Sequence, residues 1–79
     1  MNIHELGEAL AEMYHNAKGN NKVAMIHLFG IKYAQDISDS GCSKKDIAKA
    51  AKIGESYATE ISKGVKLAEF VEIKKSTQL

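Results

Sequence analysis

The sequence contains no proline, no tryptophan and no arginine, and it has a single cysteine. Because proline breaks a helix interior, its absence favours uninterrupted helices. Cys42 has no second cysteine to pair with, which excludes a disulfide within the chain. All eleven basic residues are lysines, and lysine binds phosphate as a point charge, whereas arginine is the usual bidentate reader of guanine. The composition therefore argues against a disulfide-stabilised scaffold and against strong arginine-based recognition of bases.

Long apolar runs are missing as well. No stretch approaches the roughly 20 apolar residues that a membrane helix needs, and no apolar segment after a basic start resembles a signal peptide. We therefore expect a soluble, cytoplasmic protein with no membrane partner. Hydrophobic residues make up 44% of the 79 residues, which is enough for one modest core and argues against disorder. This predicts a single domain over residues 1–79.

Charge is distributed unevenly, although the net charge is only +1. Residues 1–40 carry three lysines and five acidic residues, a net charge of −2. Residues 41–79 carry eight lysines and five acidic residues, a net charge of +3. A phosphate-binding surface requires such a local excess of positive charge, so any contact with nucleic acid is expected in the second half.

The start of the chain has the pattern of an amphipathic helix. Asn2 and Glu5 have the spacing of a capping box. Apolar residues then recur at positions 3, 6, 10, 13 and 17, which predicts a helix ending near Ala17. Gly and Asn residues at 18–21 predict a break after it.

The densest apolar run lies within residues 22–38. A strand is possible for residues 23–31 alone, but apolar residues continue at helical spacing, so a helix is preferred. Because it is apolar on nearly every side, this helix is expected to occupy the centre of the core or to form half of a dimer interface. Gly30 within it predicts the close approach of another helix.

Residues 43–63 predict two short helices joined by a tight turn. Ser43 is suited to cap the first helix, and Gly54 is expected to adopt the backbone conformation that reverses the chain. Two helices joined by a turn containing glycine form a helix-turn-helix. The apolar residues that define this motif are Ile47, Ala48, Ala51, Ile53, Ala58 and Ile61.

With these residues the segment resembles the helix-turn-helix of bacterial and phage DNA-binding proteins, whose pattern is roughly x-Ile-Ala-x-x-Ala-Gly-Val-Ser-x-x-x-Val-x-x-Ile. The resemblance covers about a quarter of the chain. It implies that Ala48 lies where the first helix crosses the second, since only a small side chain fits there. Lys52 stands where the family has its turn glycine, and Gly54 stands where the family often has a capping Ser or Thr. A looser or differently shaped turn is therefore expected.

Gly64 is expected to end the second helix. The following residues permit three interpretations: a short strand at 70–73, a short closing helix over 65–71, or an extended tail after about Glu69. The extended tail is preferred. The predicted fold is thus a small all-α domain of four to five helices, with a two-helix unit at 1–40, the helix-turn-helix at 43–63, and a closing segment and tail at 64–79.

The resemblance implies that the second helix lies in the major groove of DNA and that lysines of the motif contact phosphates. Each lysine could equally lie on a solvated helix face. Tyr57 could pack on a sugar or lie in the core, and the core is favoured. Two glutamates are unfavourable near phosphates unless they accept from a cytosine amino group. The candidate groove residues are Glu55, Ser56, Tyr57, Thr59 and Glu60, and the candidate backbone contacts are Lys44, Lys45, Lys49, Lys52 and Lys63.

The three histidines do not converge in the sequence. His4 and Glu8 are one helical turn apart, but two exposed ligands make a poor metal site. His27 is expected to be a hydrogen-bonded core residue. Without a nucleophile–base pair or a glycine-rich phosphate loop, we expect no enzyme activity, no metal, no cofactor and no small-molecule substrate.

The expected function is that of a small bacterial-type DNA-binding protein that regulates transcription. Its partner would be double-stranded DNA, bound by a homodimer that presents two reading helices. The alternative is a protein–protein interaction or dimerisation module that keeps the helix-turn-helix packing without binding DNA. The near-neutral charge and the absence of arginine support this alternative.

Overall fold

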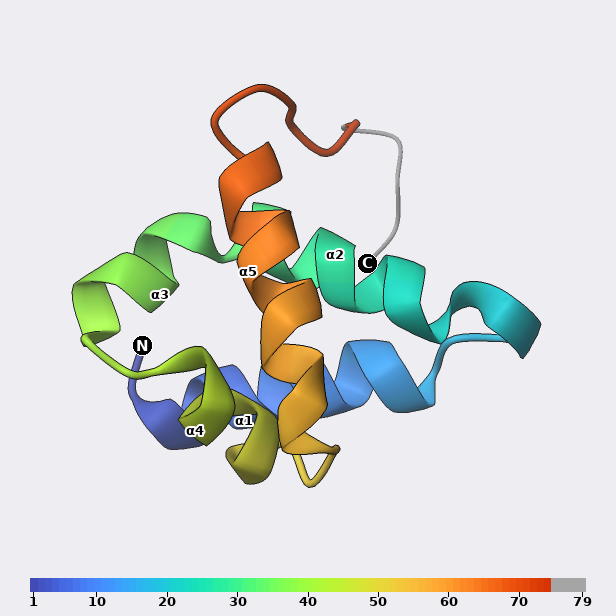
Figure 1. The fold of residues 1–79 in the computed structure, drawn as a ribbon, viewed down its shortest axis with the longest axis horizontal. Coiled ribbons are helices and arrows are strands. Elements are labelled where there is room, and N and C mark those ends of the chain that lie inside the picture. Colours follow the sequence, from blue (N-terminus) through green and yellow to red (C-terminus); the bar gives the residue numbers. More distant parts are fainter. Residues whose placement is uncertain (75–79) are drawn as a thin grey trace.

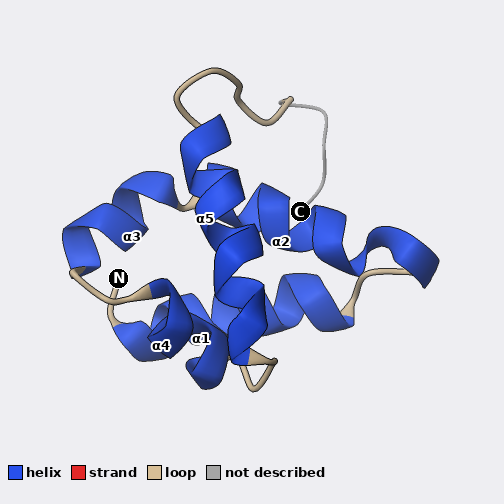
Figure 2. Ribbon diagram, in the orientation of Figure 1, coloured by secondary structure: helices blue, strands red, loops and turns tan. Residues whose placement is uncertain are grey.

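The computed structural model describes residues 1–74, and within this range it contains helices and no strand (Figure 2). The predicted all-α fold of four to five helices is confirmed. None of the helices in the described range is long and apolar enough to cross a bilayer. In chain order the elements are α1 (Ile3–His15), the 3₁₀ turn η1 (Gly19–Asn21), α2 (Lys22–Lys32), α3 (Ala34–Ser40), α4 (Lys44–Ala50), the 3₁₀ turn η2 (Glu55–Tyr57) and α5 (Ala58–Leu67).

Two helix starts have the caps that the sequence predicts. The Glu5 amide donates to Asn2 Oδ1 at 2.9 Å, and the Asn2 amide donates to Glu5 Oε1 at 3.0 Å, which completes the capping box of α1. At α4 the Asp46 amide donates to Ser43 Oγ at 3.1 Å. Each cap satisfies a backbone donor that has no partner within its helix.

The sequence predicted one continuous helix over 22–38. The structure divides this segment into two helices at Tyr33, so the prediction of a single helix is wrong. Tyr33 has φ −108° and ψ 17°, outside the α-helical region. Its ring lies 5.2 Å from that of Phe29, centroid to centroid. The bend allows α3 to bury Ile37 against the core while its polar residues remain outside. Gly41, at φ 70°, then ends α3 in the left-handed conformation.

Among the helices of residues 1–74, α2 and α5 share the most extensive contact, and α5 crosses steeply in front of α2 (Figure 1). A Cβ built on Gly30 would lie 2.7 Å from the Ile61 carbonyl oxygen and 2.8 Å from Gly64 Cα. One built on Gly64 would collide with the His27 carbonyl oxygen. The close approach predicted at Gly30 is therefore present. Gly64 lies inside α5 and is buried, so the expectation that it ends the helix is wrong.

α1 crosses α4 in a similar way. A Cβ on Gly7 would lie 2.6 Å from Ala50 Cβ and 2.9 Å from the Ala50 carbonyl carbon. α2 packs against both α1 and α5, and α4 also contacts both α1 and α5. The buried side chains of all five helices form one core: Leu6, Leu10, Met13, Ile26, Phe29, Ile37, Ile47, Ala48, Ala51 and Ile61.

The end of the described chain is a turn followed by irregular backbone. α5 continues to Leu67, so it includes the start of the alternative closing helix. The strand that the sequence left possible at 70–73 is not formed, because residues 68–70 form a hydrogen-bonded turn and 71–74 have no regular structure. Residues 75–79 of the predicted tail lie outside the described range.

Candidate functional site

The predicted helix-turn-helix consists of α4, a four-residue turn, η2 and α5 (Figure 1). Ala48 is fully buried, as the small residue at a helix crossing should be. Ile47, Ala51 and Ile61 are also buried, and Ile53 packs against the same core. The apolar pattern therefore packs α4 and α5 together as the resemblance implies.

The turn between these helices is set by Lys52 and not by Gly54. Lys52 has φ 60°, and it alone among the non-glycine residues of the described chain has a positive φ. The Ile53 amide donates to the Ala48 carbonyl at 3.1 Å, and the Lys52 amide donates to the Lys49 carbonyl at 2.9 Å. These two bonds form a Schellman motif, the regular way to end a helix on a left-handed residue. Gly54 has an ordinary extended φ of −62°, so the expectation that this glycine reverses the chain is wrong.

The turn is consequently regular, and the expectation of a looser shape is wrong as well. Lys52 adopts the conformation of the glycine that the resemblance places at this position. A side chain in the left-handed region costs about 1 kcal/mol or more. The chain thus keeps a lysine at a position where glycine would be more stable.

Replacing Lys52 with glycine should therefore stabilise the protein by about 1 kcal/mol, which raises the melting temperature of a domain of this size by roughly 4–8 °C. Differential scanning calorimetry measures the change. Lys49→Gly is the matched control, because Lys49 lies within α4 and glycine there should lower stability by about 1 kcal/mol. If the Lys52→Gly variant were less stable than wild type, contacts of the Lys52 side chain would stabilise the fold by more than the left-handed conformation destabilises it.

The first turn of the second helix is held against α1 by two tyrosines. The hydroxyl groups of Tyr14 and Tyr57 are hydrogen-bonded at 3.3 Å, and the two rings meet edge to face at 5.6 Å. This hydrogen bond is the main reason that the pKa of Tyr57 is raised above its ordinary value of 10.0. Lys22 Nζ lies 4.5 Å from the centre of the Tyr14 ring and donates to the Tyr14 carbonyl. Tyr57 is half-buried and packs against the core, which is the one of its two predicted positions that the sequence favoured.

Glu60 also faces inward, against the expectation that it is exposed. The Nε2 atom of His27, on α2, lies 2.7 Å from Glu60 Oε1. Lys63 Nζ lies 3.3 Å from Glu60 Oε2. The side chain of Glu60 is 22% exposed. The hydrogen bond with His27 is the largest cause that holds the pKa of Glu60 below its ordinary value of 4.5, and Lys63 adds to it. His27 is hydrogen-bonded, as predicted, but half-exposed.

The lowered pKa of Glu60 predicts a pH-dependent contribution to stability. A carboxyl group whose pKa is lower in the folded state stabilises the fold above its unfolded pKa, and this contribution is lost as the pH falls through the folded value. Wild type should therefore unfold at a higher urea concentration than Glu60→Gln at pH 7, and the difference should shrink as the pH falls below 4.5. Glu8→Gln, which changes an exposed carboxylate on α1, is the control. An unchanged difference at acidic pH would contradict the prediction.

The outer surface of η2 and α5 carries small hydroxyl side chains. Glu55, Ser56 and Thr59 are exposed, as predicted. The structure adds Ser62 and Lys66, which line the same shallow surface as Thr59. Their spacing of three and seven residues from Thr59 places them on one face of a helix, and this signal was available in the sequence.

The five predicted phosphate contacts divide into two groups. Lys49 Nζ lies 3.9 Å from Glu55 Oε1, and Lys63 pairs with Glu60. Within residues 1–74, Lys44, Lys45 and Lys52 form no ion pair. The pair of Lys49 with Glu55 also indicates that the exposed side of α4 and the start of the second helix share one face of the molecule.

Two short helices that are joined by a four-residue turn and packed through a buried alanine seam are the features of a helix-turn-helix. The family described as HTH-like domain matches residues 2–74 of the chain. The chain belongs to this HTH-like domain family. No curated protein and no solved structure matches it.

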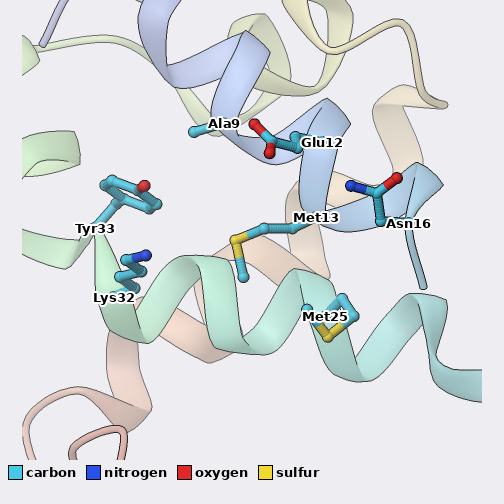
Figure 3. A pocket seen from close by; sticks show the side chains of 7 residues that line it. All are labelled: Ala9, Glu12, Met13, Asn16, Met25, Lys32 and Tyr33. Carbon is cyan, nitrogen blue, oxygen red and sulfur yellow. The ribbon is translucent and has the colours of Figure 1, made fainter. Parts of the chain in front are cut away.

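This HTH-like domain also has a cleft of about 240 Å³ between α1 and α2 (Figure 3). Met13 reaches from α1 towards α2 in its interior. Glu12 and Lys32 supply charges at its walls, but its lining has no histidine, cysteine or serine, so a Ser–His or Cys–His pair cannot form there. Within residues 1–74 no group of three His, Cys, Asp or Glu side chains is arranged to hold a metal ion. The helix-turn-helix surface is thus the better candidate for a functional site.

Proposed function

We propose that this HTH-like domain binds double-stranded DNA through α4, the turn and α5. The observation that carries the proposal is the set of lysines at both ends of α4, Lys44, Lys45 and Lys52, which have no acidic partner within residues 1–74. Unpaired lysines on a motif of this shape are suited to neutralise phosphates. Ser56, Thr59 and Ser62 are exposed on the second helix of the same motif.

Each part of the surface has a role in this proposal. Lys44, Lys45 and Lys52 bind phosphates and set the position of the motif on the duplex. Lys49 and Lys63 can join them, although each now shares its charge with a glutamate. The side chains that face the groove are Ser56, Thr59 and Ser62, with Glu55 at the edge.

Tyr57 and Glu60 take a different role from the one predicted. Their hydrogen bonds to Tyr14 and His27 join the second helix to α1 and α2. We propose that they position the helix, because a half-buried side chain held by another element is poorly placed to contact a base.

The wider proposal follows the same expectation from the sequence. Residues 1–79 act as one domain, in the cytoplasm, as a regulator of transcription that binds DNA as a homodimer. Hydroxyl groups accept or donate to any base, and no arginine is present to read guanine. Modest sequence preference and strong salt dependence are therefore expected.

The test is a fluorescence-anisotropy titration of random-sequence duplex, repeated over a series of salt concentrations. Each phosphate neutralised contributes about −0.9 to the slope of log K against log [salt]. Three unpaired lysines should therefore give a slope of roughly −3 or steeper. No binding at low salt would overturn the proposal.

The second candidate function is a protein–protein interaction module that keeps this packing and binds no DNA. It is favoured by the ion pairs that occupy Lys49, Lys63 and Lys66 and by the net charge of only +1. The same titration separates the two candidates, because a module of this kind would show no salt-dependent association with duplex.

A further inference from the structure

The cleft between α1 and α2 lies outside the helix-turn-helix, and its lining is both apolar and charged (Figure 3). Met13 is buried in its interior, and Met25 and Tyr33 are half-buried at its walls. Its volume of about 240 Å³ is that of about eight molecules of liquid water. Drug-sized ligands occupy pockets of about 300–1,000 Å³, so this cleft is suited to a smaller organic molecule.

Two opposite charges line the cleft without pairing. Glu12 of α1 and Lys32 of α2 are both among its lining residues, and both are exposed. Neither forms an ion pair within residues 1–74. Lys32 Nζ lies 5.4 Å from the centre of the Tyr33 ring, so this ammonium group lies beside an aromatic wall and not beside a carboxylate. The cleft therefore offers one free carboxylate and one free ammonium group to a ligand.

The charged and apolar groups occupy different parts of the cleft. Lys32 and Tyr33 lie at one end, and Glu12 extends from the α1 wall (Figure 3). The side chains of Met13 and Met25 supply apolar surface from α1 and α2. Methionine is flexible and polarisable, so it adapts to apolar groups of different shapes. An apolar group of a ligand can thus be covered while its charged groups reach the two walls.

The charges restrict the class of ligand. A ligand with a single charge would pair with one wall and be repelled by the other, because like charges that face each other are unfavourable. An uncharged apolar ligand would cover both charged groups without giving either a partner, and covering an unpaired charge is costly. A small zwitterion with an apolar group satisfies both charged walls and the methionines at once.

We propose that the cleft binds an α-amino acid with an apolar side chain. Its ammonium group pairs with the Glu12 carboxylate, and its carboxylate pairs with Lys32 Nζ. Its side chain packs against Met13 and Met25. Both polar contacts are charge-assisted hydrogen bonds, which are the strong class in proteins. The two charges lie on different helices and come together only in the fold, so spacing along the sequence does not indicate this site.

NMR of the methionine methyl groups in the full chain, without DNA, tests the proposal. The chain has three methionines, and Met1 is not part of the cleft, so its methyl group is an internal control. L-leucine and L-phenylalanine are the probes. At least one of them should shift the methyl signals of Met13 and Met25 with a dissociation constant of about 1 mM or tighter, while the Met1 signal stays in place.

Analogues that lack one charge test the need for a zwitterion. Isoamylamine is leucine without its carboxylate, and isocaproate is leucine without its ammonium group. Phenethylamine and hydrocinnamate are the corresponding analogues of phenylalanine. Each should bind at least about tenfold more weakly than its amino acid, because one charged wall loses its partner.

Variants of the two charged walls complete the test. Glu12→Gln and Lys32→Gln should each weaken binding of the amino acid by at least about tenfold. Glu8→Gln and Lys18→Gln are the matched controls, because they make the same changes of charge at exposed residues outside the cleft. The controls should change the dissociation constant less than about twofold, since an exposed charge that does not touch the ligand contributes little.

Three results would overturn the proposal. One is that neither amino acid shifts the methyl signals of Met13 and Met25 at concentrations up to about 10 mM. Another is that an amine or a carboxylic acid alone binds as tightly as its amino acid, since the cleft would then recognise a single charge. The third is an unchanged affinity in Glu12→Gln or Lys32→Gln while circular dichroism shows the variant folded. Because no DNA is present, each result is independent of the duplex titration.

Discussion

Gly64→Ala should lower the free energy of unfolding by at least about 2 kcal/mol. A Cβ at this position would collide with the His27 carbonyl oxygen and lie 2.9 Å from Gly30 Cα. Both are backbone atoms, which cannot move aside as the end of a flexible side chain can. α2 and α5 would have to separate, and this crossing is the main contact between the two halves of the chain.

The size of the effect follows from two opposing terms. Alanine is a better helix former than glycine by about 1 kcal/mol, which favours the variant. Overpacking against a rigid neighbour costs about 3 kcal/mol or more, and separating the helices exposes part of the core as well. A small domain has only a few kcal/mol of stability, so a net loss of at least about 2 kcal/mol removes a large share of it. Gly30→Ala should act in the same way, because its Cβ would meet the backbone of α5.

Gly54→Ala provides the matched control. Gly54 has a negative φ, and the nearest atoms to a Cβ there are 3.7 and 3.8 Å away, which is ordinary contact distance. The unfolded chain loses entropy when glycine is replaced, which offsets the weaker capping by alanine. Chemical denaturation should therefore show a change within about 0.5 kcal/mol. If Gly64→Ala were as stable as Gly54→Ala, the close crossing of α2 and α5 would be contradicted.

Local patterns in the sequence predicted the helices well. The capping box at Asn2, the cap at Ser43 and the apolar spacing of the first helix each depend on residues within one or two turns. Such signals need no knowledge of the rest of the molecule. The resemblance of residues 43–63 to known helix-turn-helix segments also implied that Ala48 lies at a helix crossing, and Ala48 is fully buried.

The errors arose where a distant element decides the outcome. Gly64 has the appearance of a helix end in the sequence, but it is required inside α5 because the backbone of α2 passes against it. Glu60 has the spacing of an exposed residue. In the structure it is instead hydrogen-bonded to His27, which lies 33 residues earlier in the chain. Tyr57 is held in the same manner by Tyr14. None of these pairings is visible from spacing along one helix.

The turn after α4 was predicted wrongly for a different reason. Glycine is the residue most often found in the left-handed conformation, so the sequence favoured Gly54 as the residue that reverses the chain. The hydrogen bonds that close the Schellman motif fix the left-handed position two residues earlier, at Lys52. The geometry of the helix end thus overrides the preference of the residue, and the lysine is placed at the tip of the motif, next to the proposed DNA surface.

Lys45→Glu combined with Lys52→Glu should reduce affinity for duplex DNA by at least about a hundredfold at low salt, because two phosphate contacts become repulsive. The slope of log K against log [salt] should become shallower by roughly 2. The fold should survive, since a negative charge is favourable at the start of α4 and unfavourable at its end, and the two effects on the helix dipole offset each other.

Lys18→Glu combined with Lys32→Glu makes the same change in net charge outside the helix-turn-helix. Both lysines are exposed, Lys18 before η1 and Lys32 at the end of α2. If DNA binding depends on lysines placed by the motif, this control should lose only the long-range part of the attraction, which salt screens over about 10 Å. Equal losses of affinity and equal changes of slope in the two variants would mean that the protein binds DNA through its net charge alone. The regular turn that presents Lys52 would then have no part in binding, and the proposal that α4 and α5 form the interface would fail.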